Sequence, residues 1–178
     1  MKKLIFLGIL IIVAITGFLL WNYKSPEEPG LIITNFDECI AAGYPALESY
    51  PQQCKTPEGE TFVEDIGNEI EKIDLIRINT PRPNQLVKNP LEIKGEARGY
   101  WFFEADFPVR LIDDNGQELG ITIAQALLEW MTEDFVPFEA TLEFQTPSTK
   151  KGTLILEKDN PSGLPENADE LRVPVSFQ

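Results

Sequence analysis

The stretch that decides the fold is WFFEADFPVRLIDDNG, from Trp101 to Gly116. Its first part, Trp101–Ile112, is rich in aromatic and branched residues and predicts a long β-strand, in which Pro108 favours an edge or a bulge. The following Asp113–Gly116 run predicts a tight hairpin, because Asn-Gly suits the primed turns that join paired strands. Leu119–Ile123 is then expected to pair back on the first strand.

Outward from this hairpin, short β-like runs recur at regular spacing with turn residues between them. The further strand candidates are Ile73–Asn79, Leu91–Gly95, Thr141–Gln145, Thr153–Glu157 and Leu171–Phe177. One stretch, Ala124–Trp130, has a helical pattern and is expected to cross between sheets. About seven strands in roughly 105 residues match the size and spacing of an immunoglobulin-like β-sandwich. The sequence therefore predicts a mainly β domain over residues 73–178.

The N-terminus carries a long apolar run. Leu4–Trp21 contains no charged residue and follows Lys2 and Lys3. As a helix it would span roughly 26 Å, close to the thickness of a hydrocarbon core. The run is longer than the apolar part of a usual secretory signal and no A-x-A-like cleavage site follows it, so residues 1–22 are predicted to be a transmembrane signal anchor. A cleaved signal peptide is the alternative.

The two lysines place the N-terminal end of this anchor in the cytoplasm and the rest of the chain outside. We therefore expect a single-pass protein of the cell membrane whose C-terminal domain is extracytoplasmic. Residues 23–34 contain Pro26 and Pro29 among polar residues and are predicted to form a short, stiff tether.

A small cysteine module is predicted over residues 35–66. Its two cysteines, Cys39 and Cys54, are the only ones in the chain, and outside the cytoplasm an isolated pair is most simply a disulfide. The turn at Pro57-Glu58-Gly59 predicts a small hairpin behind the second cysteine. A structural spacer is the favoured role, and contact of its loop with a partner is the alternative.

Composition restricts the classes of function. The chain of 178 residues has 15 basic and 29 acidic residues; without the three lysines that flank the apolar run, 12 basic and 29 acidic residues leave a net charge of −17. Such a surface repels phosphate backbones, so we expect no nucleic-acid partner. There is no histidine, the commonest general base and metal ligand. We expect no enzyme, no catalytic residue, no cofactor and no metal.

Two acidic alternatives remain open. Five acids, Glu104, Asp106, Asp113, Asp114 and Glu118, could hold calcium. The Asp113–Gly116 turn lacks the spaced acidic residues and the later glutamate of a calcium loop, so a plain turn is favoured. Acidic pairs alone can cleave glycosides, but no two carboxylates stand apart as such a pair.

Five residues form the candidate contact surface: Arg98, Trp101, Phe102, Glu104 and Trp130. Core packing is the favoured interpretation for the aromatic members and for the neighbouring Phe103 and Phe107, which are expected to face one way on the strand. The alternative is that an outward aromatic marks a contact patch. Arg98 is expected to pair with Glu104 or Glu129.

Two strings, GEARGYWFFEADFPVRLIDDNG (Gly95–Gly116) and AQALLEWMTEDFVPFEATLEF (Ala124–Phe144), resemble the Gmad-type immunoglobulin-like domain of bacterial spore-germination proteins. The similarity covers Ile73–Gln178. It implies a bacterial cell-surface sandwich that mediates contacts within envelope or spore assemblies, without known catalysis. Asn35–Asp65 resembles a two-cysteine module of exported bacterial proteins, to which no activity is attached.

The expected function is thus a membrane-anchored structural or protein-interaction module of the bacterial cell envelope. Its partner would be an envelope protein. The alternative is a carbohydrate-binding module whose partner is a cell-wall polymer. An exposed flat aromatic would favour the alternative, and an apolar patch with a polar rim would favour a protein partner.

Overall fold

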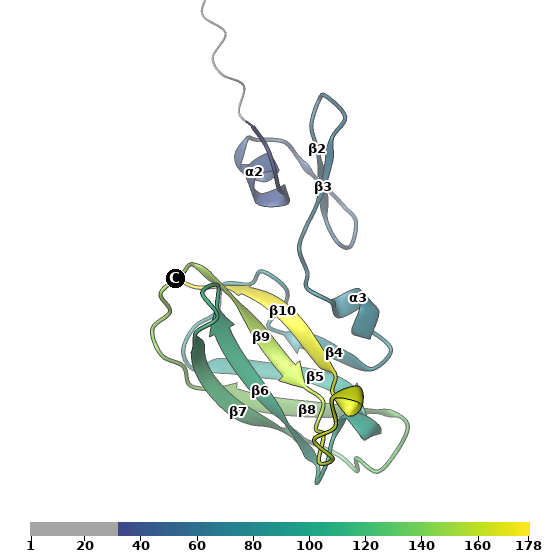
Figure 1. Cartoon of the computed structure of the whole chain (residues 1–178). Helices are drawn as coiled ribbons and strands as arrows, with labels where there is room; N and C mark the ends of the chain where they lie inside the picture. The colour runs from purple at the N-terminus through teal and green to yellow at the C-terminus, as the bar shows by residue number, and fades with distance from the viewer. Residues whose placement is uncertain (1–31) are drawn as a thin grey trace, which may run out of the picture.

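The structure is a computed structural model that describes residues 32–178 (Figure 1). The predicted anchor, residues 1–22, and nearly all of the predicted tether lie outside the described residues. Within residues 32–178, no helix is both long enough and apolar enough to cross a membrane.

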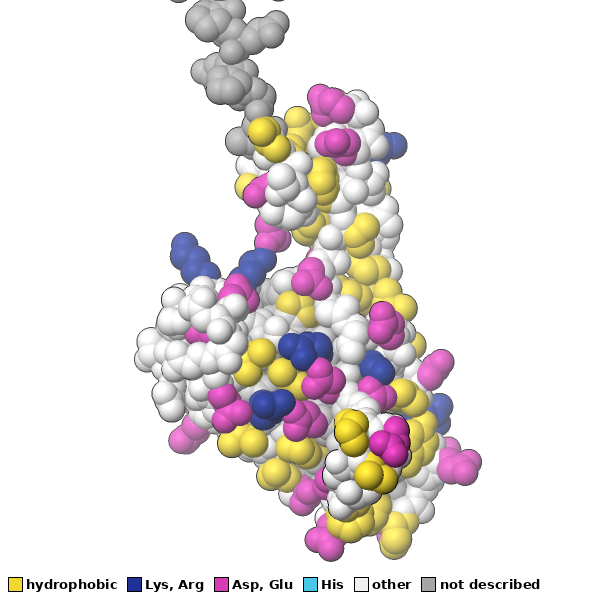
Figure 2. Space-filling view, in the orientation of Figure 1, with side chains coloured by type: hydrophobic (Ala, Val, Ile, Leu, Met, Phe, Trp, Pro, Cys, Tyr) yellow, Lys and Arg dark blue, Asp and Glu magenta, His cyan; other side chains and the backbone are white. Residues whose placement is uncertain are grey.

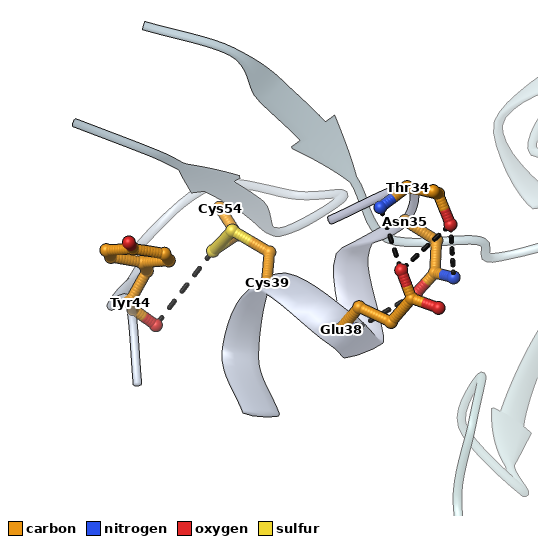
Figure 3. The surroundings of a disulfide bond; sticks show 6 residues. All are labelled: Thr34, Asn35, Glu38, Cys39, Tyr44 and Cys54. Carbon is orange, nitrogen blue, oxygen red and sulfur yellow. Dashed lines mark hydrogen bonds between the residues drawn. A yellow bond between two sulfur atoms is a disulfide. The ribbon is translucent and has the colours of Figure 1, made fainter. Parts of the chain in front are cut away.

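The first described part is a small module stapled by a disulfide. It consists of helix α2 (Phe36–Ala41) and the antiparallel strands β1 (Ala46–Leu47), β2 (Gln53–Lys55) and β3 (Thr61–Val63). The predicted disulfide is confirmed: Cys39 on α2 is bonded to Cys54 on β2, and both residues are fully buried (Figure 3). The predicted hairpin is also confirmed, as the β2–β3 pair.

Helix α2 starts at a side-chain cap (Figure 3). The Asn35 side chain accepts a hydrogen bond from the Glu38 backbone N–H at 2.9 Å, and the Glu38 carboxylate accepts two from Thr34 at 2.8 Å. The hydrogen bonds from Thr34, the backbone one first, lower the pKa of Glu38. Because a first turn leaves backbone donors free, this cap fixes where the short helix begins and so where Cys39 lies.

The second part is a β domain of seven strands, the number predicted. They are β4 (Ile76–Thr80), β5 (Leu91–Arg98), β6 (Asp106–Asp113), β7 (Glu118–Ala126), β8 (Phe135–Leu142), β9 (Lys151–Glu157) and β10 (Glu170–Ser176). Two short 3₁₀ helices, η1 (Gly99–Trp101) and η2 (Pro165–Asn167), lie in the connections. All strand pairs are antiparallel, in the order β10-β9-β6-β7-β8-β5-β4.

The seven strands form one sheet that nearly closes on itself, instead of the two separate sheets predicted. Figure 1 shows β4, β5 and β8 lying across β6, β7, β9 and β10, as the two layers of a sandwich would. The layers are joined because β7 and β8 pair through Gln125 and Ala126. On the other side, the segment after β4 runs beside β10, with a bridge between Leu86 and Ser176. The prediction of a sandwich was therefore correct in the mainly β class and in the number of strands, but wrong in the separation into two sheets.

The free edge of β10 is also covered by a side chain. Asn68 donates from Nδ2 to the Glu170 carbonyl at 2.9 Å and accepts the Arg172 N–H at 2.7 Å. The Asn68 side chain thus makes two hydrogen bonds of the kind that a neighbouring strand would make. An uncovered edge would be open to pairing with another chain, so this contact protects the domain.

The core lies between the two layers. On β6, Phe107, Val109 and Leu111 are fully buried, as strand alternation requires. The Phe107 ring packs on Phe102 at 5.2 Å and edge-on against Phe138 at 4.9 Å between centroids. This aromatic cluster connects β6 with β8, since no disulfide crosses the core.

Three details of the strand predictions were wrong. Trp101–Ile112 is not one strand: Trp101 belongs to η1, and Glu104 and Ala105 have positive φ values of 53° and 69°, so β6 starts at Asp106. In consequence Phe103 is 41% exposed, whereas Phe107 is buried. The Ala124–Trp130 segment is not helical, because β7 continues to Ala126.

The strand predicted at Thr141–Gln145 is instead β8, which begins six residues earlier at Phe135. Pro137 is tolerated there for a geometric reason. Its carbonyl accepts the Leu127 N–H at 2.8 Å, on the β7 side, so its nitrogen also points away from β5. The missing N–H therefore removes no hydrogen bond of the β5–β8 ladder.

The predicted β6–β7 hairpin is confirmed, with a different turn. Asp113 N–H donates to the Gln117 carbonyl at 3.0 Å, so three residues lie in the loop. Gly116 has φ 78°, and neither Asp114 nor Asn115 has a positive φ. A three-residue loop that ends in a left-handed glycine is the next most common hairpin after the primed turns.

Candidate functional site

The structure separates the five predicted contact residues. Trp101 is fully buried and Phe102 is 3% exposed, so both belong to the core, which removes them from the predicted contact surface. Glu104 is exposed, and Arg98 and Trp130 are half-buried. The surface role of these last three stays a prediction.

A cluster of exposed apolar side chains lies directly beside them. The loop between β7 and β8, residues 127–134 and here named the distal loop, carries Leu127, Leu128 and Met131 with 50%, 68% and 73% of their surface exposed. Three large apolar residues this exposed within five positions form a candidate contact patch.

The conformation of the distal loop is supported by hydrogen bonds within the loop and to β8. Leu127 N–H donates to the Pro137 carbonyl at 2.8 Å, and Thr132 N–H to the Trp130 carbonyl at 2.7 Å. The Thr132 hydroxyl accepts the Asp134 N–H at 3.2 Å. The Trp130 side chain packs against the core. The exposed leucines and methionine thus stand on a fixed frame.

Gly99 and Arg98 fix the loop to the end of β5. Gly99 N–H donates to the Asp134 carbonyl at 3.2 Å, and a Cβ on Gly99 would lie 1.9 Å from the Thr132 carbonyl oxygen. Only glycine allows this close approach. Arg98 donates to the carbonyls of Glu133 and Asp74, at 3.2 and 3.0 Å, and stacks on Phe135 at 4.0 Å.

The predicted ion pair of Arg98 with Glu104 or Glu129 was therefore wrong. The guanidinium instead supports backbone carbonyls, which a planar group with five donors does well. Arg98 and Trp130 are supports of the distal loop, and the exposed side chains that they support are the contact candidates.

A tight turn lies beside the distal loop. Phe103 and Asp106 exchange backbone hydrogen bonds of 3.0 and 3.2 Å around Glu104 and Ala105, and Ala126 N–H donates to the Ala105 carbonyl at 2.8 Å. Phe103 is 41% exposed and Tyr100, on η1, is 50% exposed. We name Tyr100, Phe103, Leu127, Leu128 and Met131 together the apolar end. Figure 2 shows yellow and magenta side chains together at this lower end of the domain.

The sequence interpretation missed the three distal-loop residues. Its prediction for Ala124–Trp130 was a helical segment that crosses between sheets, and that prediction did not place Leu127 and Leu128 on the surface. The string LLEWMTED could have indicated their exposure. Two adjacent leucines are followed there by acidic residues, so the segment does not form a continuous apolar face that could pack on the core.

At the opposite end, three side chains connect the module to the domain. Glu69, the first residue of helix α3 (Glu69–Lys72), is 6% exposed. Arg82, after β4, donates to its carboxylate at 2.8 Å and to the Tyr50 hydroxyl at 2.7 Å. The Tyr50 hydroxyl in turn donates to Glu69. Since Tyr50 lies in the module and Arg82 in the domain, a buried carboxylate joins the two parts.

The Tyr50 hydroxyl of this joint stays protonated at physiological pH. Burial raises the pKa of Tyr50 to about 12, and the hydrogen bond and negative charge of Glu69 add to this effect. The phenol therefore remains a donor. Two more contacts cross the same boundary: Lys151 pairs with Asp37, and Asn84 donates to the Glu64 carboxylate at 3.0 Å. The module is thus fixed on the domain away from the apolar end (Figure 1).

The acidic turn at Asp113 is fully used within the fold. Asp113 is 2% exposed. Its carboxylate accepts hydrogen bonds from the N–H groups of Asn115 and Gln117, at 2.9 and 3.0 Å, and from the Ser148 hydroxyl at 2.5 Å. The Ser148 hydrogen bond, first, and then the backbone hydrogen bonds lower the pKa of Asp113, against the effect of burial. The carboxylate holds the hairpin to the β8–β9 connection.

The replacement Asp113→Asn is expected to lower the melting temperature at neutral pH. The pKa of Asp113 is lower in the folded protein than in the unfolded chain. The carboxylate therefore stabilises the fold fully at pH values above the unfolded pKa, about 3.9. It disappears as pH falls through the lowered folded value. Thermal melts of both proteins from neutral pH to about pH 3 should show the difference shrink. A difference that stays constant with pH would contradict this account.

The fold and the surface define a class: an immunoglobulin-like β domain with an exposed apolar end and an attached disulfide module. The chain belongs to the family of immunoglobulin-like domains of bacterial spore germination, whose family model matches residues 75–163, half of the chain. This confirms the resemblance drawn from Gly95–Gly116 and Ala124–Phe144. No curated protein and no solved structure gives a significant match.

Proposed function

We propose that this protein is a membrane-anchored interaction module of the bacterial cell envelope and that the apolar end is its contact surface for another protein. The observation that carries the proposal is the exposure of Leu127, Leu128 and Met131 on a loop fixed by Gly99 and Arg98. We propose no catalytic role for it.

Energetics favour a contact role for these side chains. Complete burial of a leucine or methionine contributes about 1.5–3 kcal/mol, so covering three of them would supply several kcal/mol before the costs of association. Those costs are reduced because the loop is already ordered. Apolar side chains at the centre of an interface commonly carry most of its binding energy.

Three observations support an extracytoplasmic location for the part of the chain that follows the apolar run. Leu4–Trp21 is an uncharged run long enough for an anchor, behind two lysines. The Cys39–Cys54 disulfide suits an oxidising compartment. The module, which follows the apolar run in the sequence, lies at the end of the molecule away from the distal loop (Figure 1). A tether there would hold the apolar end away from the membrane. The family adds a role connected with spore germination to the proposal.

The apolar end favours a protein over a cell-wall polymer. Sugar-binding surfaces use flat aromatic faces, whereas the most exposed side chains here are the aliphatic Leu128 and Met131. Tyr100 and Phe103 lie on short turns and not on the face of the sheet.

The double replacement Leu128→Ser and Met131→Ser is expected to abolish partner binding without loss of fold, because exposed positions tolerate polar residues within about 0.5 kcal/mol. The test is mild crosslinking in native membranes, followed by comparison of what co-purifies with the two proteins. The matched control is Ile121→Ser, at a position 58% exposed on β7 outside the apolar end.

A protein that is lost with the double variant and retained with the control supports the proposal. Equal recovery with all three proteins contradicts it. In a parallel assay, sedimentation of the soluble part with purified cell wall, without any protein partner, would favour the carbohydrate alternative instead.

A further inference from the structure

We infer that the partner of the apolar end is a cationic amphipathic segment of another protein, with apolar side chains for the centre and lysines or arginines for the rim. The inference rests on the proposed function, because it specifies the partner of the same surface.

The first observation is a rim of acidic groups. Glu104 lies on the turn beside Phe103, and Glu129, Glu133 and Asp134 lie on the distal loop itself; all four are exposed. Among residues 32–178, none of these four takes part in a salt bridge. Acids on the neighbouring strands do find partners, as Glu96 does with Arg77 and Glu157 with Arg110.

The second observation is a shortage of local counter-charge. Between Gly99 and Asp134 the only basic residue in the sequence is Arg110. It pairs with Glu157 on β9 and Glu118 on β7. Arg98, just before this stretch, is bound to two backbone carbonyls and to the Phe135 ring. Arg77 also lies over the Phe135 ring, but it is paired with Glu96. Among the described residues, four carboxylates therefore have Arg98 as their one nearby cation without a salt-bridge partner, and most of their negative charge remains uncompensated.

Uncompensated carboxylates around exposed leucine and methionine define the complementary partner. A basic rim would relieve the repulsion among the four acids and increase the association rate, while apolar side chains of the partner cover Leu127, Leu128 and Met131. The same charges disfavour an anionic lipid surface. A neutral polysaccharide would leave the acids unpaired.

The test uses three peptides of defined chemistry: an amphipathic leucine–lysine peptide, the same peptide with glutamate in place of lysine, and a scrambled leucine–lysine peptide without an apolar face. Binding to the soluble part of the protein, residues 23–178, is measured by fluorescence anisotropy. We expect the amphipathic cationic peptide to bind at least about tenfold more tightly than either of the others. Its affinity should fall steeply between about 50 and about 300 mM salt.

Charge-reversed variants locate the binding site. The pair Glu104→Lys and Glu133→Lys, whose carboxylates accept no hydrogen bond within the described residues, is expected to weaken binding at least about tenfold. The matched control, Glu58→Lys and Glu60→Lys in the turn of the module, changes the net charge by the same amount and should leave most of the affinity. Leu128→Ser with Met131→Ser should also weaken binding at least about tenfold. Circular dichroism checks that each variant is folded.

Equal effects of the two charge pairs would mean attraction by net charge alone and would overturn the inference, as would equal binding of the three peptides. These results leave the proposed function standing if the co-purified protein still depends on Leu128 and Met131. Loss of that dependence, by contrast, removes the proposed function itself.

Discussion

Replacement of Phe107 by alanine is expected to lower the free energy of unfolding by about 3–5 kcal/mol. The ring is fully buried and contacts both Phe102 and Phe138, so its removal leaves a cavity between the two layers of the sheet. Since a domain of this size has a total stability of about 5–15 kcal/mol, the loss would be a large part of it. Denaturant unfolding followed by tryptophan fluorescence measures the change.

The matched control is Phe103→Ala. The same side chain is removed four residues away, but Phe103 is 41% exposed, so the expected loss is small. Similar losses for both variants would mean that β6 does not start where the structure places it, after the turn at Glu104 and Ala105.

Removal of the disulfide by Cys39→Ser with Cys54→Ser is expected to destabilise the module by about 3 kcal/mol, the chain-entropy value for a loop of this length. Helix α2 and the three short strands bury little besides the two sulfurs, so the module should unfold. The β domain has a separate core and should keep its melting temperature. Hydrogen exchange resolved by residue measures both effects.

The control is the same measurement on the variant Tyr50→Phe, which removes a hydroxyl from the joint and keeps the disulfide. It should leave α2 protected. Loss of protection throughout β4–β10 in the cysteine variant would show that the module and the domain unfold as one unit, contrary to this account.

Local chemistry made several features predictable. Asn-Gly in Asp113–Gly116 predicted the hairpin, and an isolated cysteine pair predicted the Cys39–Cys54 bond. The number of strands followed from the spacing of turn residues. In each case the residues that determine the structure are close in sequence or have one plausible partner.

Other features depend on tertiary contacts that no local pattern contains. The turn at Glu104 and Ala105 has positive φ at two residues that rarely adopt it, so nothing in the string WFFEAD indicated a break. On one side, the two layers are connected by the pairing of β7 with β8, and on the other by the segment at Leu86, which runs beside β10. The joint at Glu69 unites Tyr50 and Arg82, which are 32 positions apart.

The five residues predicted as a contact surface are neighbours of the exposed apolar side chains, but they are not the same residues. Arg98, Glu104 and Trp130 were singled out, and all three lie at the apolar end or support it. Leu127, Leu128 and Met131 were not, because apolar residues are expected inside and only the structure reveals that these lie outside.

The most direct test of the central claim is site-specific photocrosslinking in intact cells. A benzoylphenylalanine residue is placed at Leu128 in one protein and at Ile121 in another, positions that are 68% and 58% exposed. The account predicts a discrete protein adduct from position 128 and none from position 121. The same adducts from both positions, or an adduct from position 121 alone, would contradict the assignment of the apolar end as the contact surface.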